Sequence, residues 1–288
     1  MKTLTRLQIQ AYRSSPWLAG AAFAWFILFL VVPLFIVAVY SLGLRGTYGG
    51  VTFSAGLTPE NYARILDPIY FGVFLRSLGL SMMTSVSCLL IGYPMAYVMA
   101  TARKRYRNLL MVLVVIPFWT NFVVRTYALK AALAENGPVN RWLIAAGWLH
   151  EPFVFSGTTF AVWLGMVTNY LPFMVLPLYV ALEKFDFTLL EAAGDLGASP
   201  TTRFFRILLP LTRRGVVTGL IFVFAPALGE FVIPDLLGGA KTLLVGNLIT
   251  DQFLKVRDWP FGAALSLVLI ALVCISLRVS FRSARSAS

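Results

Sequence analysis

Six apolar runs, each long enough to cross a lipid bilayer as a helix, dominate this chain of 288 residues. A helix rises about 1.5 Å per residue and therefore needs about 20 apolar residues to span the hydrocarbon core. The runs occupy residues 17–42, 72–101, 109–130, 157–181, 215–237 and 261–281. They leave no room for a separate soluble domain, so the sequence predicts an all-α, polytopic membrane protein with six transmembrane helices.

The composition agrees with a chain that faces lipid. Hydrophobic residues make up 59% of the sequence and charged residues 12%, whereas soluble domains carry about 25% charged residues. The net charge of +12 would suggest nucleic acid in a soluble protein, but the basic residues form short clusters between the apolar runs. We therefore expect a lipid membrane, and no nucleic acid, as a partner. The first run is too long for a signal peptide core and is interpreted as an uncleaved anchor.

The distribution of lysine and arginine predicts the orientation of the spans. Fifteen of the 24 basic residues fall on one side of the predicted membrane. They are Lys2, Arg6, Arg13, Arg103, Lys104, Arg105, Arg107, Lys184, Arg203, Arg206, Arg213, Arg214, Arg278, Arg282 and Arg285. Because basic residues accumulate in cytoplasmic loops, we expect both termini to be cytoplasmic.

The outer loops have a different character. In segment 43–71, Thr58 is placed to cap a short helix with Pro59 at its first position. Segments 131–156 and 238–260 carry tryptophans typical of the headgroup level. These are Trp142, Trp148 and Trp259.

The longest inner loop, residues 182–214, carries the strongest functional signal. Leucine and alanine recur at helical spacing up to Gly197, which ends a first short helix. Ser199 then caps a second one with Pro200 at its first position, and Pro210 is expected to end the segment. From the residues alone, two such helices either dock into a groove on another protein or lie on the membrane surface as an amphipathic linker.

The same loop resembles a known family motif. Glu191-Ala192-Ala193, Gly197 and Ile207-x-Leu209-Pro210 match the EAA-x-x-x-G-(about nine)-I-x-L-P pattern of permease subunits in type I ATP-binding-cassette (ABC) importers. The resemblance implies the permease fold, with a tail, first span and outer loop over 1–70 and the shared transmembrane domain over 71–288. It also implies that the loop contacts an ATPase subunit through Glu191, Ala192, Ala193, Asp195 and Gly197.

Further stretches resemble the first permease subunit of spermidine/putrescine importers. They are Gly92–Tyr97, Ile116–Asn121, Val124–Ala128, Gly229–Gly239 and Arg257–Ala264. Leu129 departs from the tryptophan expected at its position. A polyamine is the substrate that this resemblance implies, but relatives with the same pattern also carry opines, aminophosphonates and other small organic solutes.

The resemblance implies several partners in a bacterial inner membrane. They are a homologous second permease, two cytoplasmic ATPase subunits and a periplasmic solute-binding protein. This chain would bind no cofactor or metal itself, because ATP and Mg²⁺ belong to the ATPases, and it would not be an enzyme. Two alternative hypotheses are a stand-alone channel and a membrane-embedded enzyme. A channel needs no docking loop, and an enzyme needs a cluster of reactive side chains at one depth in the membrane.

Charged side chains within the spans predict the substrate path. Arg125 interrupts span three, and Glu230 and Asp235 lie at the outer half of span five. An ionisable group in a span is costly unless it is paired or faces water. Either Arg125 pairs with one of the acids and holds two helices together, or the acids line an aqueous cavity that attracts a polycation. Aromatic or polar neighbours complete the predicted path: Trp119, Asn121, Tyr127 and Phe231.

Overall fold

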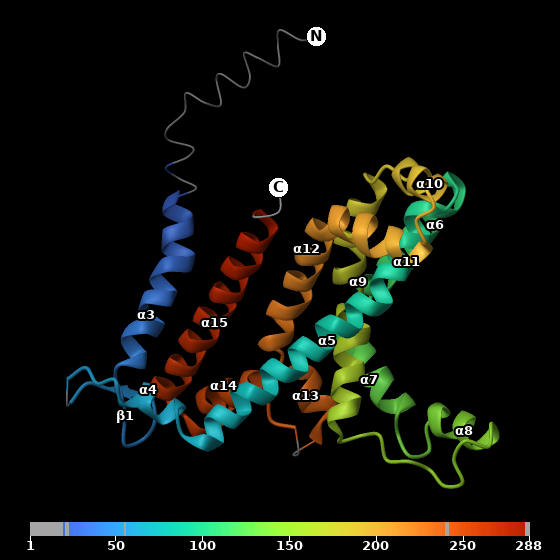
Figure 1. The fold of residues 1–288 in the computed structure, drawn as a ribbon. Helices are drawn as coiled ribbons and strands as arrows, with labels where there is room; N and C mark the ends of the chain where they lie inside the picture. Colours follow the sequence, from blue (N-terminus) through green and yellow to red (C-terminus); the bar gives the residue numbers. More distant parts are fainter. Residues whose placement is uncertain (1–19, 21–22, 55, 240–241, 286–288) are drawn as a thin grey trace. The chain divides into compact units, whose positions relative to one another are not determined.

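The computed structural model describes residues 20, 23–54, 56–239 and 242–285 (Figure 1). Lys2, Arg6, Arg13 and Lys241 lie outside the described residues, as does most of the start of the first predicted span. The chain forms two compact units. The first contains the described residues up to Ile65 together with Gln252–Val268, and the second contains Leu66–Asp251 together with the residues from Leu269 onward. The expected division at residue 70 stays a prediction.

Helices account for about three quarters of the described chain, as the apolar runs predict. Among the described residues, five helices are long and apolar enough to cross a membrane: Phe23–Ser41, Pro68–Thr101, Thr159–Glu183, Pro200–Leu228 and Trp259–Arg278. A sixth span exists if the bent pair Lys104–Trp119 and Phe122–Ala132 counts as one. The expected all-α membrane fold is therefore confirmed.

The first unit joins an apolar helix to a small β-hairpin. Its elements are η1 (Ile27–Val31), α3 (Val32–Ser41), β1 (Leu44–Arg45), β2 (Val51–Thr52), α4 (Glu60–Ile65), η4 (Gln252–Val256) and the start of α15 (Trp259–Arg285). The two strands pair antiparallel. Thr58 Oγ1 accepts a hydrogen bond from the Glu60 backbone N–H at 3.3 Å, so the predicted cap is confirmed, although α4 begins at Glu60.

An ion pair ties α4 to the start of α15 within this unit. Arg64 Nη1 lies 3.0 Å from Asp258 Oδ2, and its guanidinium carbon lies 4.1 Å from the centre of the Phe261 ring. Asn61 Nδ2 donates to the carbonyl oxygens of Ser41 and Gly43 at 3.0 and 2.8 Å. These bonds fix the short helix α4 against the end of α3.

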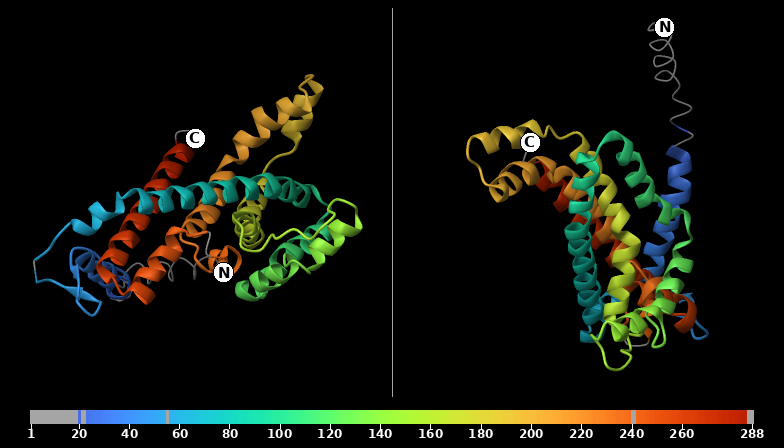
Figure 2. Two further views of the ribbon diagram at one scale, coloured as in Figure 1. Left: turned by 90° about the horizontal axis from the view of Figure 1, so that it is seen from below. Right: turned by 90° about the vertical axis from the view of Figure 1, so that its right-hand side faces the viewer.

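The second unit is built around three helices that pack against one another. They are α5 (Pro68–Thr101), α9 (Thr159–Glu183) and α12 (Leu209–Leu228), which lie side by side in Figure 2. Close approach requires a small residue on α12, because a Cβ at Gly215 would lie 2.9 Å from the Pro177 carbonyl oxygen on α9. Tyr93 on α5 and Thr212 on α12 share a buried hydrogen bond of 2.9 Å between their hydroxyl oxygens. The remaining helices of the unit are α6 (Lys104–Trp119), α7 (Phe122–Ala132), α8 (Pro138–Ala145), α10 (Thr188–Asp195), α11 (Pro200–Arg203), α13 (Val232–Leu237) and α14 (Val245–Asp251).

The third predicted span, residues 109–130, is not one straight helix. The helices α6 and α7 meet at an angle of 92°. Thr120 adopts an extended conformation with ψ of 140°, and the Asn121 side chain accepts a hydrogen bond from the Val123 N–H at 2.8 Å. Asn121 therefore starts a new helix instead of continuing the first one. Pro117 inside the last turn of α6 weakens that turn further, since proline has no N–H to donate.

The expected limits of span five are also wrong at both ends. Helix continues from Pro200 to Leu228, so Pro210 does not end the preceding segment. The π-helical turn η2 (Phe204–Leu208) comes directly before Leu209 and Pro210, and this wider turn accommodates the missing proline N–H. At the other end, α12 stops at Leu228 and α13 begins at Val232. Glu230 therefore lies in a helix break rather than within a span.

Candidate coupling and translocation sites

The segment that joins α9 to α12, residues 184–208 (the α10–α11 segment), carries the predicted EAA motif. Asp186 Oδ1 accepts hydrogen bonds from the N–H and the hydroxyl of Thr188 at 3.1 and 2.8 Å, which starts α10. Ser199 Oγ accepts from the Thr202 N–H at 3.3 Å, which starts α11 as predicted. The two predicted short helices are confirmed, although the second one merges into α12.

Gly197 ends α10 in a geometry that favours glycine. Its φ is +84°, a region that side chains with a Cβ rarely adopt. The Ala198 N–H donates to the Ala193 carbonyl at 2.9 Å and the Gly197 N–H donates to the Gly194 carbonyl at 2.9 Å. This pair of bonds is the Schellman pattern of a helix end. The predicted backbone conformation of Gly197 is therefore confirmed, while its role in coupling remains to be tested.

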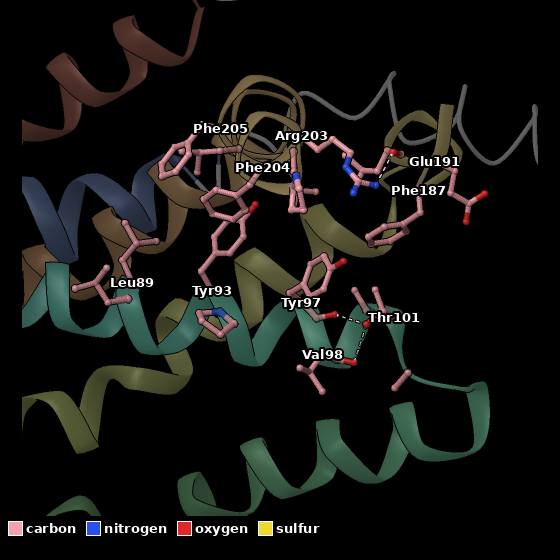
Figure 3. Close-up of a pocket in the computed structure, with 18 of the residues that line it drawn as sticks. Leu89, Tyr93, Tyr97, Val98, Thr101, Phe187, Glu191, Arg203, Phe204 and Phe205 are labelled. Carbon is pink, nitrogen blue, oxygen red and sulfur yellow. Dashed lines mark hydrogen bonds between the residues drawn. The ribbon is translucent and has the colours of Figure 1, made fainter. Parts of the chain in front are cut away.

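Aromatic contacts hold the α10–α11 segment against α5. Figure 3 shows Tyr97 below Phe187 and Tyr93 below Phe204, with ring centroids 6.0 and 5.4 Å apart in edge-to-face arrangements. Such pairs stabilise by about 0.5–1.5 kcal/mol beyond the burial of their area. The segment is thus packed onto the helical core and is not a free tether.

The outer face of the same segment is open. Leu196, directly before Gly197, is 89% exposed, and Glu191, Ala192 and Asp195 are exposed as well. Ala193 is partly buried on the inner side of α10. The motif therefore presents an apolar tip flanked by two acids, which suits docking on a partner.

Arg203 is a residue of this segment whose local role sequence reasoning missed. Its Nη1 donates to the Leu190 carbonyl at 3.3 Å and lies 2.9 Å from where a Cβ at Gly194 would stand. It thereby joins the beginning of α11 to α10. In the sequence Arg203 is one member of a basic cluster, so only the fold distinguishes it from its neighbours.

A second site surrounds the break between α12 and α13. Glu230 Oε1 accepts hydrogen bonds from the backbone N–H groups of Phe231, Val232 and Ile233 at 3.1, 2.9 and 3.2 Å, and its Oε2 accepts one from the Tyr170 hydroxyl on α9. Asn247 Nδ2 donates to the Phe231 carbonyl at 2.8 Å. Neither Tyr170 nor Asn247 was expected here, because nothing local in the sequence links them to the break.

Of the two alternatives for Arg125, the pairing with an acid is not found in the part of the chain that the structure describes. Arg125 Nε and Nη1 are buried and have no hydrogen-bond partner among the described residues. Neither candidate acid serves as its partner. The Glu230 carboxylate caps α13, and the Asp235 side chain is exposed in the first turn of α13. An Arg125–acid bridge therefore does not hold these helices together.

The structure brings most of the predicted path residues to two neighbouring helices. The helices α7 and α13 contact each other, and each begins at a break in a predicted span. Asn121 caps α7, whereas Tyr127 on α7 and Phe231 before α13 are about half exposed. Trp119 at the end of α6 is 88% exposed. In secondary transporters, interrupted helices form the substrate site in this way.

Comparisons with known proteins agree with this geometry. Residues 89–284 match the family described as "Binding-protein-dependent transport system inner membrane component". The chain is 45% identical over 261 residues to the spermidine/putrescine transport system permease protein PotB of Haemophilus influenzae, covering 91% of each chain. It is 43% identical to the Escherichia coli protein of the same name, covering 91% of this chain and 94% of the relative. It is also 32% identical to the molybdenum transport system permease protein ModB of Mycobacterium bovis, covering 75% and 81%.

Solved structures show the same fold. A bacterial alginate ABC transporter in complex with an alginate-bound periplasmic protein contains a similar chain, with a TM-score of 0.71, 17% identity and coverage of 99% of this chain and 96% of that one. The MetNI methionine ABC transporter contains another, with a TM-score of 0.57, 18% identity and coverage of 77% and 99%. The resemblance carried by the EAA motif is thereby confirmed. The chain belongs to the family of binding-protein-dependent transport system inner membrane components, the permease subunits of ABC importers.

Proposed function

We propose that this permease forms the translocation path for a polyamine, putrescine or spermidine, across a bacterial inner membrane. It would act together with a homologous second permease, two cytoplasmic ATPase subunits that bind ATP and Mg²⁺, and a periplasmic solute-binding protein. The main observation in favour of a polyamine substrate is sequence identity. The chain is 43–45% identical, over nine tenths of its length, to permeases named for spermidine and putrescine transport.

The geometry around α7 and α13 supports a cationic substrate. Asp235 is an exposed carboxylate, and the exposed rings of Trp119, Tyr127 and Phe231 offer faces that attract ammonium groups. Glu230 contributes differently from its predicted role, because both of its oxygens already accept hydrogen bonds. We assign Asp235 and the three aromatic residues to the contact with substrate, and Asn121 and Glu230 to the shape of the path.

The α10–α11 segment supports the coupling of transport to ATP hydrolysis. Its exposed tip would enter a cleft of the ATPase, while the contacts of Phe187 and Phe204 with α5 would pass the motion to the core. A rigid helix pair held at both ends moves as one body, which is what a two-state transporter requires. We assign this role to Glu191, Asp195 and Gly197. Ala192 and Ala193 are small, so they would let the surface of α10 approach the ATPase closely.

Transport by the assembled importer tests this function. The four cognate components are reconstituted in liposomes, and the uptake of labelled putrescine, spermidine and molybdate is measured with and without ATP. The proposal predicts ATP-dependent uptake of a polyamine and none of molybdate. Uptake of neither polyamine by an importer that hydrolyses ATP would refute the substrate and leave the permease assignment intact.

Arg125 favours a second candidate substrate class within the same kind of importer. Its buried Nε and Nη1 have no partner among the described residues, and a guanidinium suits a carboxylate or phosphonate. An opine, an aminophosphonate or another amphoteric solute would satisfy both Arg125 and Asp235. Competition of these compounds against labelled putrescine distinguishes the two classes, because only the second candidate predicts that an amphoteric solute displaces the polyamine.

A further inference from the structure

A cavity of about 1120 Å³ lies between α5 and the α10–α11 segment (Figure 3). It exceeds the range of about 300–1,000 Å³ that is usual for small-molecule sites. Most of its lining is apolar and comes from one face of α5 and from η2, and Arg107, Glu191 and Arg203 are its charged lining residues. The cavity therefore combines a long hydrocarbon surface with a small charged end.

Both arginines of the lining have an unsatisfied donor. Arg203 uses Nη1 for the Leu190 carbonyl, while Arg107 uses Nη1 for Glu183 at 3.0 Å and Nη2 for the Ala100 carbonyl at 2.7 Å. In each guanidinium the Nε atom is buried and has no partner among the described residues. A donor shielded from water without an acceptor is unfavourable, so the two side chains lack an acceptor that a bound group could supply.

The charge around the cavity favours an anion. Glu191 is the acid of the lining, and it is exposed at the far end of the segment in Figure 3. Arg103, Lys104 and Arg105 follow Ala102 of the lining directly, and Arg206 follows Phe205. Basic residues thus outnumber acids in the lining and directly beside it, even when Glu183, which pairs with Arg107, and Asp186, which precedes Phe187, are counted. Arginine is well suited to phosphate oxygens because its planar fork donates two parallel hydrogen bonds.

The apolar part of the lining is open in the isolated chain. Leu90 and Val98 of α5 and Phe205 of η2 are 70%, 56% and 60% exposed. They belong to helices that are apolar and long enough to cross a membrane, so lipid is the solvent that such side chains meet. A molecule that fills the cavity must therefore have an anionic group that binds the arginines and a hydrocarbon part that packs against α5.

We propose that this cavity binds an acidic phospholipid. Its phosphate accepts hydrogen bonds from Arg107 and Arg203, and an acyl chain lies along Leu90, Val98 and Phe205. Basic pockets between transmembrane helices on the cytoplasmic side are known to hold such headgroups. Because Arg203 also joins α10 to α11, the bound lipid braces the α10–α11 segment against α5. Lipid composition would then influence how firmly this segment is held.

Native mass spectrometry of the assembled importer tests the proposal without any polyamine. The complex is equilibrated with micelles that contain equal amounts of phosphatidylglycerol and phosphatidylcholine, and the lipid that remains bound is counted. The wild-type complex is expected to retain phosphatidylglycerol in preference. Arg203→Gln should reduce this retention about fivefold, the effect of one basic side chain near an acidic lipid. Arg141→Gln on α8 is the control, since Arg141 is exposed and is not a lining residue of the cavity, and it should leave the retention unchanged.

A second pair of variants separates lipid occupancy from the fold of the α10–α11 segment. Val98→Trp fills the hydrocarbon part of the cavity and should also lower phosphatidylglycerol retention, whereas Met82→Trp on an exposed part of α5 outside the lining should not. Equal retention of the two lipids by the wild-type complex would overturn the proposal. So would displacement of phosphatidylglycerol by millimolar inorganic phosphate, because a free anion would then be the ligand. Absence of bound lipid because the second permease covers the cavity would overturn it as well.

Discussion

The carboxylate of Glu230, in the break between α12 and α13, accepts a hydrogen bond from the hydroxyl of Tyr170 on α9. The same carboxylate accepts three backbone N–H groups at the start of α13. One side chain thus ends span five, starts α13 and joins both to the core. The break is a fixed part of the fold rather than a frayed helix end.

Replacing Glu230 with alanine is expected to destabilise the assembled complex. The change removes the acceptor of three N–H groups and leaves the Tyr170 hydroxyl without its partner, which should cost about 1–3 kcal/mol. A lower apparent unfolding midpoint of the purified complex in detergent is the expected result. Asp235→Ala is the matched control, since Asp235 is exposed and should leave the midpoint unchanged. Equal midpoints for Glu230→Ala and wild type would contradict the capping role.

Gly246 is expected to tolerate no larger side chain. A Cβ at this position would lie 2.5 Å from the Gly229 carbonyl oxygen and 2.7 Å from that of Glu230, so α14 approaches the break as closely as backbone allows. Gly246→Val should lower the yield of folded protein, because overpacking costs about 1–3 kcal/mol. Gly229→Ala serves as control, since its Cβ would meet its nearest atom only at 3.8 Å. A normal yield of Gly246→Val would show that this contact is easily relieved.

Gly197→Val is expected to uncouple the importer while leaving the chain inserted. A β-branched residue is strained at a φ of +84°, so the helix end must change and the exposed tip at Leu196 must move. Uptake and transport-stimulated ATP hydrolysis should fall together at a normal level of membrane protein. Gly197→Asn should retain more activity, because asparagine tolerates positive φ better. Gly79→Ala on α5, where nothing lies within 4 Å, controls for the loss of a glycine. Normal transport by Gly197→Val would refute the coupling role of this turn.

The predicted topology is tested by reporter fusions that are active only in the cytoplasm. Fusions near Arg105, Thr202 and Ser288 are expected to give signal, and those near Gly50, Gly147 and Lys241 are not. The reason is the concentration of fifteen of the 24 basic residues on one side. A cytoplasmic signal from the Gly147 fusion would require a different arrangement of the spans.

The sequence predicted what depends on composition and local chemistry, and missed what depends on distant contacts. The apolar runs, the Ser199 cap and the backbone of Gly197 follow from residues close together in the chain. The sharp bend at Asn121 was not predicted, because a polar residue in an apolar run shows that the run is interrupted but does not show that a new helix starts there in another direction. The role of Glu230 was missed because Tyr170, which fixes it, lies 60 residues away.

The fit between Asp235 and a polyamine is tested most directly by transport with a single charge removed. Labelled putrescine uptake is measured in liposomes that contain the complete importer, either wild type or Asp235→Asn, with equal amounts of assembled complex. We expect ATP-dependent accumulation by the wild type and a decrease of about tenfold in Asp235→Asn, the loss of one favourable charge contact. Unchanged accumulation by Asp235→Asn would contradict the assignment of this carboxylate to the polyamine path.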